Sequence, residues 1–339
     1  MSGSSPVLVV TMGDPAGIGP EIIAKALAHR DVFEVCQPVV VGDLRAMQAA
    51  VRITGVPLDV RAVETPTEAG RGLGTIDVLD LCNIDIERVG RARVSAEVGR
   101  AAYEYLERAT RLSLDGQVAA VVTAPINKEA LSLAGWVGVG HTELLARLCG
   151  VPEKSVAMML ASRRLRVVHV STHVPLRRAI ELVTTDRIVT TARLAGEAAR
   201  DIVGRKPCLA VAGLNPHAGE HGLFGAEEEE YIAPAVRRLV EEGWDVTGPI
   251  PPDTVFLRAA NGEFDAVVAM YHDQGHIPSK FAGFHDTVNV TLGLPIIRTS
   301  VDHGTAYDIA GTGKANEENL LAAIKLAARM ACNRAVGTG

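Results

Sequence analysis

The stretch AVVAMYHDQGHIPSK, residues 266–280, joins a short apolar run directly to a histidine and a carboxylate. Short runs rich in β-branched residues and bounded by turn residues are typical of buried strands. Two more apolar runs, residues 165–170 and 209–214, also lead into a histidine within three residues. In open parallel α/β sheets, ligands bind beyond the carboxyl ends of the strands. Imidazoles at such ends can meet in space, so the sequence predicts a metal site formed by His173, His217 and His272.

Strand-like runs alternate with helical patterns along the whole chain. The expected strands cover residues 7–11, 38–41, 118–123, 156–160, 167–170, 209–212, 266–270 and 288–292. The clearest helical patterns lie at residues 96–114 and 320–330, where apolar residues recur every three or four positions. This alternation predicts an α/β protein with a largely parallel sheet covered by helices on both faces.

The bulk composition is that of a globular protein. The chain has 339 residues, of which 47% are hydrophobic and 22% charged, enough for one large or two ordinary domains. A net charge of -6 gives no electrostatic reason to expect nucleic acid as a partner. No apolar stretch approaches the roughly 18 residues that span a bilayer, so no membrane partner is expected. The start lacks a basic leader pattern, so a cytoplasmic location is expected.

Two local compositions lead to expectations of their own. Five cysteines without paired spacing are expected to be buried free thiols of a reducing compartment. The acidic run at residues 227–230 is expected to be the solvated start of a helix.

A glycine-rich turn, GDPAGIGPE at residues 13–21, follows the first expected strand and opens a helix over residues 22–28. Glycines allow a tight turn and close backbone approach, and a helix N-terminus offers free N–H groups to an anion. The spacing matches neither the dinucleotide fingerprint nor the phosphate-binding loop with its lysine. A ligand-binding turn and a plain strand-to-helix turn both remain open.

Several polar residues flank turns and could bind a small anionic substrate, because arginine and lysine commonly bind phosphate and carboxylate groups. They are His141, Thr142, Lys280, Asn289 and Arg298. Ordinary structural ion pairs are the alternative for each one alone. Among the other histidines, His169 lies inside an expected strand and should be in the core, whereas His29 and His221 should lie on the surface.

The stretch TSVDHGTAYDIAGTGKAN, residues 299–316, resembles the adenosine-binding loop of the isocitrate and isopropylmalate dehydrogenases, and their early GIGPE turn matches residues 17–21. The chain as a whole more specifically resembles the 4-hydroxythreonine-4-phosphate dehydrogenase (PdxA) family. The matching motifs lie at residues 13–21, 140–143, 172–176, 213–220, 271–275 and 293–304. They follow one another in consistent order, so together they are far more specific than any one motif.

The resemblance implies a two-lobed α/β/α fold like that of isocitrate and isopropylmalate dehydrogenase, with the active site in the cleft between the lobes. A cofactor-side lobe would comprise residues 1–130 and 300–339. A lobe for the metal, the substrate and dimerisation would comprise residues 131–299. The family is homodimeric, and its metal site is completed across the dimer interface.

The resemblance also assigns roles to individual residues. His173, His217 and His272 become ligands of one divalent metal ion, with Zn, Co, Ni, Mn and Mg not distinguished. The substrate-binding positions are His141, Thr142, Lys280, Asn289 and Arg298, and Asp253 corresponds to an acidic residue near the same cleft. The reaction also needs a general base, for which Asp253 and Lys280 are the candidates. The cofactor-binding positions are Gly17, Gly19, His303, Gly304, Ala306, Asp308 and Asn316. A carboxylate at Asp308 can accept hydrogen bonds from ribose hydroxyls and repels a 2′-phosphate, which favours NAD.

Departures from the vitamin-pathway pattern bear on the substrate. His276-Ile277-Pro278 stands where those members more often carry Leu-Pro, and the loop at residues 284–287 lacks their extra glycines. These variants resemble the branch that acts on D-threonate and D-erythronate 4-phosphates. That branch would oxidise C3 and decarboxylate the substrate, giving dihydroxyacetone phosphate from phosphothreonate. The alternatives are 4-phosphohydroxy-L-threonine and a cyclic cis-diol dicarboxylate. A transferase related to the phosphate acyltransferases is the alternative from a different class.

Overall fold

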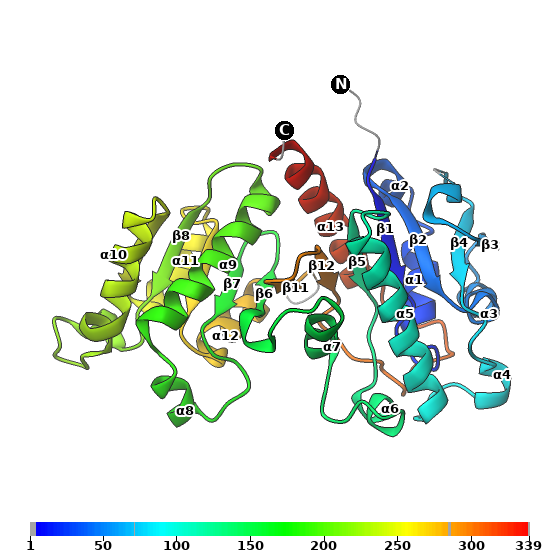
Figure 1. Ribbon diagram of the computed structural model, residues 1–339, viewed down its shortest axis with the longest axis horizontal. Coiled ribbons are helices and arrows are strands. Elements are labelled where there is room, and N and C mark those ends of the chain that lie inside the picture. Colours follow the sequence, from blue (N-terminus) through cyan, green and yellow to red (C-terminus); the bar gives the residue numbers. More distant parts are fainter. Residues whose placement is uncertain (1–4, 71, 284–285, 338–339) are drawn as a thin grey trace. The chain divides into compact units, whose positions relative to one another are not determined.

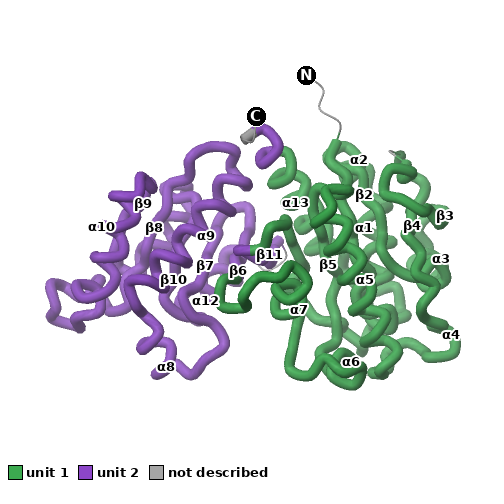
Figure 2. Tube along the Cα trace, in the orientation of Figure 1, with its two compact units in different colours: residues 1–156, 294–332 green, residues 157–293, 333–339 purple. Residues whose placement is uncertain are grey.

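The computed structural model describes residues 5–70, 72–283 and 286–337. The chain divides into two compact units, coloured separately in Figure 2. The first unit comprises Met1–Val156 and Leu294–Cys332, and the second comprises Ala157–Gly293 and Asn333–Gly339. Each unit is built on its own set of adjacent strands.

The sheet of the first unit is parallel. Its strand order is β3-β4-β2-β1-β5-β12. The strands are β1 (Val7–Thr11), β2 (Gln37–Gly42), β3 (Asp59–Val63), β4 (Thr75–Asp80), β5 (Ala120–Thr123) and β12 (Arg298–Ser300). Val9 of the central strand β1 lies opposite Val39 of β2 and Val121 of β5, and all three are fully buried. Continuous apolar runs of this kind are typical of parallel strands covered on both faces.

Four helices of the first unit, α3 to α6, begin at polar residues whose side chains cap them. The helices are α1 (Gly19–Ala26), α2 (Arg30–Val35), α3 (Leu44–Thr54), α4 (Ile86–Val89), α5 (Ala96–Leu114), α6 (Lys128–Leu133), α7 (His141–Leu148) and α13 (Glu318–Gly337). The Ser95 side chain accepts a hydrogen bond from the Val98 backbone N–H at the start of α5, and Asp43 caps α3 in the same way. One face of α5, including Tyr105 and Leu106, is buried against the sheet.

The second unit has a mixed sheet, with strand order β11-β6-β7-β10-β8-β9. The strands are β6 (Ala157–Ala161), β7 (Arg166–His169), β8 (Cys208–Ala212), β9 (Asp245–Ile250), β10 (Ala266–Ala269) and β11 (Val288–Leu292). Strands β7, β10, β8 and β9 are parallel, but β6 is antiparallel to both β7 and β11. A tight turn in which the Ser162 hydroxyl donates to the Leu165 carbonyl joins β6 to β7, and such short connections require antiparallel strands.

Helices and short turns complete the second unit: α8 (Leu176–Glu181), α9 (Thr185–Val203), α10 (Ala233–Glu241), α11 (Pro252–Ala260) and α12 (His272–Ala282). Figure 1 shows α9 lying along strands of this sheet, and α9 contacts β7, β8 and β10. Phe256 of α11 packs in a buried cluster with Val167, Ala210 and Val267 from three of the strands.

The strands expected from the sequence all form, and their ends differ from the expected ones by at most two residues. The expected lobe limits at 130 and 299 differ from the unit limits, because α7 and the residues up to Val156 pack with the first unit. The expectation of buried thiols is wrong for Cys82 and Cys332, which are exposed, although all five cysteines are free. Among the described helices, none has both the length and the apolar content needed to cross a membrane.

Candidate functional site

The carboxyl ends of neighbouring parallel strands bring histidines together in the second unit. His169 is the last residue of β7, and His173 follows it in the next loop. His272 is the first residue of α12, directly after β10, which pairs with β7. His217 lies in the turn after β8, the strand on the other side of β10. The three predicted ligands therefore leave adjacent strands at one edge of the sheet.

His173 and His272 line a common pocket of about 400 Å³ together with Thr172, Tyr271 and Asp273. The centroids of the two imidazole rings lie 5.6 Å apart. The Nδ1 atom of His272 is 2.7 Å from Oδ1 of Asp273, so a proton on Nδ1 can be donated to the carboxylate. This pairing leaves Nε2 as the free ring nitrogen, the arrangement by which proteins orient a metal-binding histidine.

His217 lies on a strained turn. Its φ angle is +52°, and Ala218, Glu220 and His221 are also left-handed, which is uncommon for residues with a side chain. The His217 ring lies beside Phe224, with ring centroids 6.1 Å apart. Within the described residues, no three His, Cys, Asp or Glu side chains lie close enough together to hold an ion. The structure thus pairs His173 with His272 and places His217 on the adjoining loop.

A buried carboxylate holds the His217 loop. Glu228 is only 3% exposed, and its Oε1 accepts hydrogen bonds of 2.7 Å from the backbone N–H groups of Leu214 and Asn215. Its Oε2 accepts a bond of 2.9 Å from the Asn215 side chain. The expectation that residues 227–230 form a solvated helix start is therefore wrong for Glu228. The backbone donors it satisfies are 13 and 14 residues away, which residue composition does not reveal.

Two further histidines pack behind His272. His276 is 8% exposed, and its ring stacks on His272 with centroids 3.6 Å apart and planes at 12°. His169, which is buried as expected, has Nε2 at 3.1 Å from Nδ1 of His276. Burial, followed by the neighbouring His272, lowers the pKa of His276 to about 4. Burial is also the main cause that lowers the pKa of His169 to about 3.

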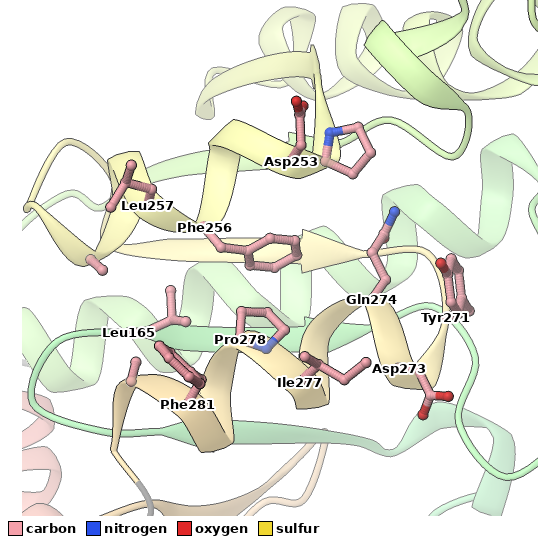
Figure 3. A pocket seen from close by; sticks show the side chains of 13 residues that line it. Leu165, Asp253, Phe256, Leu257, Tyr271, Asp273, Gln274, Ile277, Pro278 and Phe281 are labelled. Atoms are coloured by element: carbon pink, nitrogen blue, oxygen red, sulfur yellow. The ribbon is translucent and has the colours of Figure 1, made fainter.

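The two candidates for the general base lie on α11 and α12, Asp253 in the first turn of α11 and Lys280 in the last turn of α12. Asp253, at the start of α11, lines a second pocket of about 600 Å³ with Tyr271 and Asp273. Figure 3 shows Asp253 and Asp273 at separate edges of this pocket, with Phe256 and Pro278 between the two helices. Lys280 is exposed on α12.

Asn289, a predicted substrate-binding residue, lies on β11. Its side-chain N–H group donates toward the Met158 sulfur at 2.9 Å. Its Oδ1 atom is buried without a hydrogen-bond partner among the described residues. Of the loop that precedes it, residues 284–285 lie outside the described part of the chain.

In the first unit, the glycine-rich turn is closed by its own aspartate. The Asp14 carboxylate accepts hydrogen bonds from the backbone N–H groups of Ala16 and Gly17, and the Ile18 N–H donates to the Thr305 carbonyl. Three of the N–H groups that the turn could offer to an anion, those of Ala16, Gly17 and Ile18, therefore already have acceptors within the protein. A Cβ atom at Gly17 would collide with Thr305, and one at Gly19 with the Met12 carbonyl. Internal packing thus accounts for both of these glycines.

The predicted cofactor loop is attached to the same turn. Both carboxylate oxygens of the buried Glu21 accept backbone bonds, from Gly311 at 2.5 Å and from Gly313 at 2.8 Å. The Tyr307 hydroxyl donates to Asp14 at 2.6 Å. Burial raises the pKa of Asp14 to about 6 despite these bonds. The remaining predicted cofactor residues lie along this loop, and most are exposed: His303, Gly304, Ala306, Asp308 and Asn316.

The predicted anion-binding residues of the first unit lie around the start of α7. His141 and Thr142 are its first residues, and Arg298 is buried at the start of β12, where its guanidinium donates to the Thr123 hydroxyl. Nε2 of His141 is buried without a hydrogen-bond partner among the described residues. Burial and the Arg298 charge lower the pKa of His141 well below its usual value, and burial lowers that of Arg298 to about 9. A neutral imidazole beside a buried guanidinium is suited to an anionic ligand.

Sequence reasoning did not predict the supporting roles of the residues that hold these sites together: Asp14, Glu21, Tyr307, Glu228 and His276. Asp14 and Glu21 fall inside a recognised motif, so their positions were visible but their hydrogen-bond partners were not. Tyr307 bonds to a residue 293 positions away, a pairing that no local pattern indicates.

Comparisons with known proteins agree on one family. The family model described as "Pyridoxal phosphate biosynthetic protein PdxA" matches residues 34–327. The D-threonate 4-phosphate dehydrogenase of Cupriavidus necator is 51% identical, covering 99% of this chain and all of that protein. A crystal structure of 4-hydroxythreonine-4-phosphate dehydrogenase from Klebsiella pneumoniae superimposes with a TM-score of 0.89 at 47% identity, covering 96% of this chain and 100% of that one.

A more distant structure, a terephthalate 1,2-cis-dihydrodiol dehydrogenase from Burkholderia xenovorans, has a TM-score of 0.70 at 32% identity and covers 96% of this chain and 98% of its own. The family model and the curated relative both extend over most of the chain and include the histidine loops and the cofactor loop. The chain belongs to the PdxA family.

Proposed function

We propose that this protein is a metal-dependent, NAD-linked dehydrogenase that oxidises and decarboxylates a 4-phosphorylated 3-hydroxy acid, 4-phospho-D-threonate or D-erythronate 4-phosphate. The observation that carries the proposal is the pocket that His173 and His272 both line, with Asp273 at Nδ1 of the second imidazole. The name of the Cupriavidus relative supports the substrate. The two-lobed, isocitrate-dehydrogenase-like arrangement with an interlobe active site and a cytoplasmic location are parts of the proposal.

The residues present fit a divalent metal ion. Imidazole nitrogens suit zinc, cobalt, nickel and manganese, and His272 has its Nε2 free for a ligand. His173, His272 and His217, which follow adjacent strands, would be the residues that hold the ion. When bound, the ion would act as a Lewis acid that eases loss of the proton from the substrate hydroxyl.

Buried polar atoms without partners support the binding of an oxygen-rich anion. They are Nε2 of His141 beside Arg298 and Oδ1 of Asn289. A buried polar atom that lacks a hydrogen bond is costly, so a ligand that supplies the bond is bound favourably. Together with Thr142 and Lys280, these groups would bind the substrate phosphate and carboxylate and position C3.

The cofactor assignment rests on Asp308. Its carboxylate is exposed on the loop that Glu21 fixes, where it can accept hydrogen bonds from ribose hydroxyls and would repel a 2′-phosphate. NAD is therefore the proposed cofactor.

The proposed reaction has two steps, oxidation at C3 followed by decarboxylation. In the first, the C3 hydroxyl loses its proton to a general base while the hydride at C3 is transferred to NAD⁺, which leaves a 3-keto acid. In the second, the bond between C1 and C2 breaks to release CO₂, and a proton added at C2 completes dihydroxyacetone phosphate. Asp253 and Lys280 remain the two candidates for the base, since each lies within a few residues of the α11–α12 surface that adjoins Tyr271 and Asp273.

A homodimer is also part of the proposal. The surface of α11 and α12 in Figure 3 exposes large apolar side chains: Leu257 is 65% exposed, Ile277 is 66% exposed and Phe281 is 94% exposed. Exposed apolar groups of this size are typical of interfaces between subunits. A second copy covering α12 would lie next to His272, in keeping with a metal site shared across the interface.

The strongest alternative substrate is 4-phosphohydroxy-L-threonine, which the name of the Klebsiella enzyme supports. The two substrates differ at C2, which carries a hydroxyl in one and an amino group in the other. A cyclic cis-diol dicarboxylate is a more distant alternative, supported by the Burkholderia structure.

The test is NADH formation with NAD⁺ and each of the three phosphorylated substrates, with and without a chelator. The proposal predicts chelator-sensitive turnover of a 2-hydroxy acid and release of CO₂. Preference for the 2-amino acid would instead assign the protein to vitamin B6 synthesis. Undiminished turnover after the metal has been removed would contradict the metal site, and transfer of a phosphate or acyl group without redox change would favour the transferase alternative.

A further inference from the structure

His276 lies one helical turn after His272 on α12, so the two side chains share one face of the helix. Their rings are nearly parallel, with centroids 3.6 Å apart and an angle of 12° between the planes. One face of the His272 ring is thus covered by His276, while His173 lies 5.6 Å away as a tilted neighbour.

The stack continues to the end of β7. Nδ1 of His276 is 3.1 Å from Nε2 of His169 and 3.2 Å from the His272 carbonyl oxygen. A carbonyl oxygen can only accept, so a proton on Nδ1 of His276 serves both contacts, with His169 accepting through Nε2. His276 is therefore fixed from both sides, by a ring stack and by hydrogen bonds.

Gly275 makes this close packing possible. A Cβ atom at this position would collide with Nε2 of His169 and with Cγ1 of Val167. The helix can approach β7 closely enough for the His169–His276 bond only because no side chain stands between them.

We propose that His276, supported by His169, is a positioning residue that holds the His272 imidazole in the orientation needed to bind the metal ion. Asp273 fixes the ring through Nδ1, and His276 fixes its plane by stacking, so that only Nε2 remains open. The inference rests on the proposed metal site. It adds a residue that would contact neither the metal nor the substrate and would act only through His272.

The experiment measures binding of Co²⁺ alone to the metal-free protein by calorimetry and by the visible absorption bands of bound cobalt. His276→Leu removes both the ring and the hydrogen bond, His276→Phe keeps a flat ring, and His276→Gln keeps a donor without a ring. His29→Leu, which changes an exposed histidine at the start of α2, is the matched control. Thermal unfolding of each variant monitors the fold.

We expect His276→Leu and His276→Gln to weaken Co²⁺ binding by about 10- to 100-fold and to alter the cobalt bands, as the loss of an orienting partner typically does. His276→Phe should retain most of the affinity, and His29→Leu should match the wild type. Equal affinity of wild type and His276→Leu would overturn the inference and leave the proposed function standing. Wild-type protein that binds no Co²⁺ would overturn the metal site itself, and the inference with it.

Discussion

The loop at residues 301–316 in the first unit and the histidine loops of the second unit both carry predicted site residues, but they are held differently. The first is fixed by buried carboxylates, Asp14 and Glu21, that accept hydrogen bonds from distant parts of the chain. In the second, His173 and His272 lie at partly exposed strand ends with ring nitrogens still open. The backbone of the first region is fixed by bonds within the protein, whereas the second presents a ring nitrogen, Nε2 of His272, that is open to a ligand.

The largest expected effect is on catalytic activity and comes from the histidine loops of the second unit. If His272 binds the proposed metal ion, His272→Ala should lower kcat/KM by about three orders of magnitude, because losing that ion would remove several kcal/mol of transition-state stabilisation. Its side chain is 36% exposed, so the thermal midpoint should change little. NADH formation and metal content measure the first effect, and His29→Ala is the control. A large loss of stability with activity retained would break the comparison.

Glu228 tests the comparison from within the second unit, because it is a buried carboxylate of the same kind as Glu21. Glu228→Ala leaves the N–H groups of Leu214 and Asn215 without their acceptor, and we expect a loss of about 4 kcal/mol in unfolding free energy. Glu229→Ala, at the exposed neighbouring position, should stay within about 0.5 kcal/mol of the wild type. Denaturant unfolding distinguishes the two. Equal effects would mean that residues 227–230 act only as solvated charge.

The third prediction concerns how stability depends on pH through Asp14, one of the carboxylates that fix the loop at residues 301–316. Burial raises the pKa of Asp14 from 3.8 to about 6, so the folded protein binds this proton more tightly than the unfolded chain. The contribution is fully present below about pH 4 and is lost as the pH rises through 6. Relative to Asp14→Asn, wild type should therefore lose up to about 3 kcal/mol between pH 4 and 7. A pH-independent difference in unfolding free energy would contradict it.

The smallest expected effect is on cofactor preference, and it tests an exposed residue of the loop at residues 301–316. Asp308→Arg changes an exposed side chain on the loop without touching the bonds of Glu21. We expect the ratio of kcat/KM for NADP⁺ over NAD⁺ to rise by about tenfold or more, because a carboxylate that repels the 2′-phosphate is replaced by a cation. Kinetics with both cofactors measure this ratio, and an unchanged ratio would remove Asp308 from the cofactor site.

The sequence predicted the buried strands and the placement of His173, His217 and His272 at their ends, because both follow from local apolar runs. It did not predict β3, β4, β9 or β12. Strand β3 is an edge strand with mostly exposed residues, and β12 is three residues long and begins with a buried arginine. Neither has the periodicity that identifies a strand.

The supporting residues of the site could not be predicted for a different reason. The roles of Glu21 and Tyr307 depend on partners 290 and 293 positions away, and that of His276 depends on His169, 107 positions away. Such pairs exist only in the folded chain. The acidic run at residues 227–230 was misjudged because its composition predicted exposed side chains throughout, whereas Glu228 is buried.

The bonds from Glu21 to Gly311 and Gly313 also bear on how the protein is made. The first unit joins the start of the chain to residues near its end, whereas the main part of the second unit is the unbroken segment Ala157–Gly293. As the polypeptide leaves the ribosome, this inserted segment can fold before residues 311–313, the partners of the turn at residues 13–21, have been synthesised. Contacts of such long sequence separation form slowly. The histidine-bearing unit should therefore be assembled before the cofactor loop is in place.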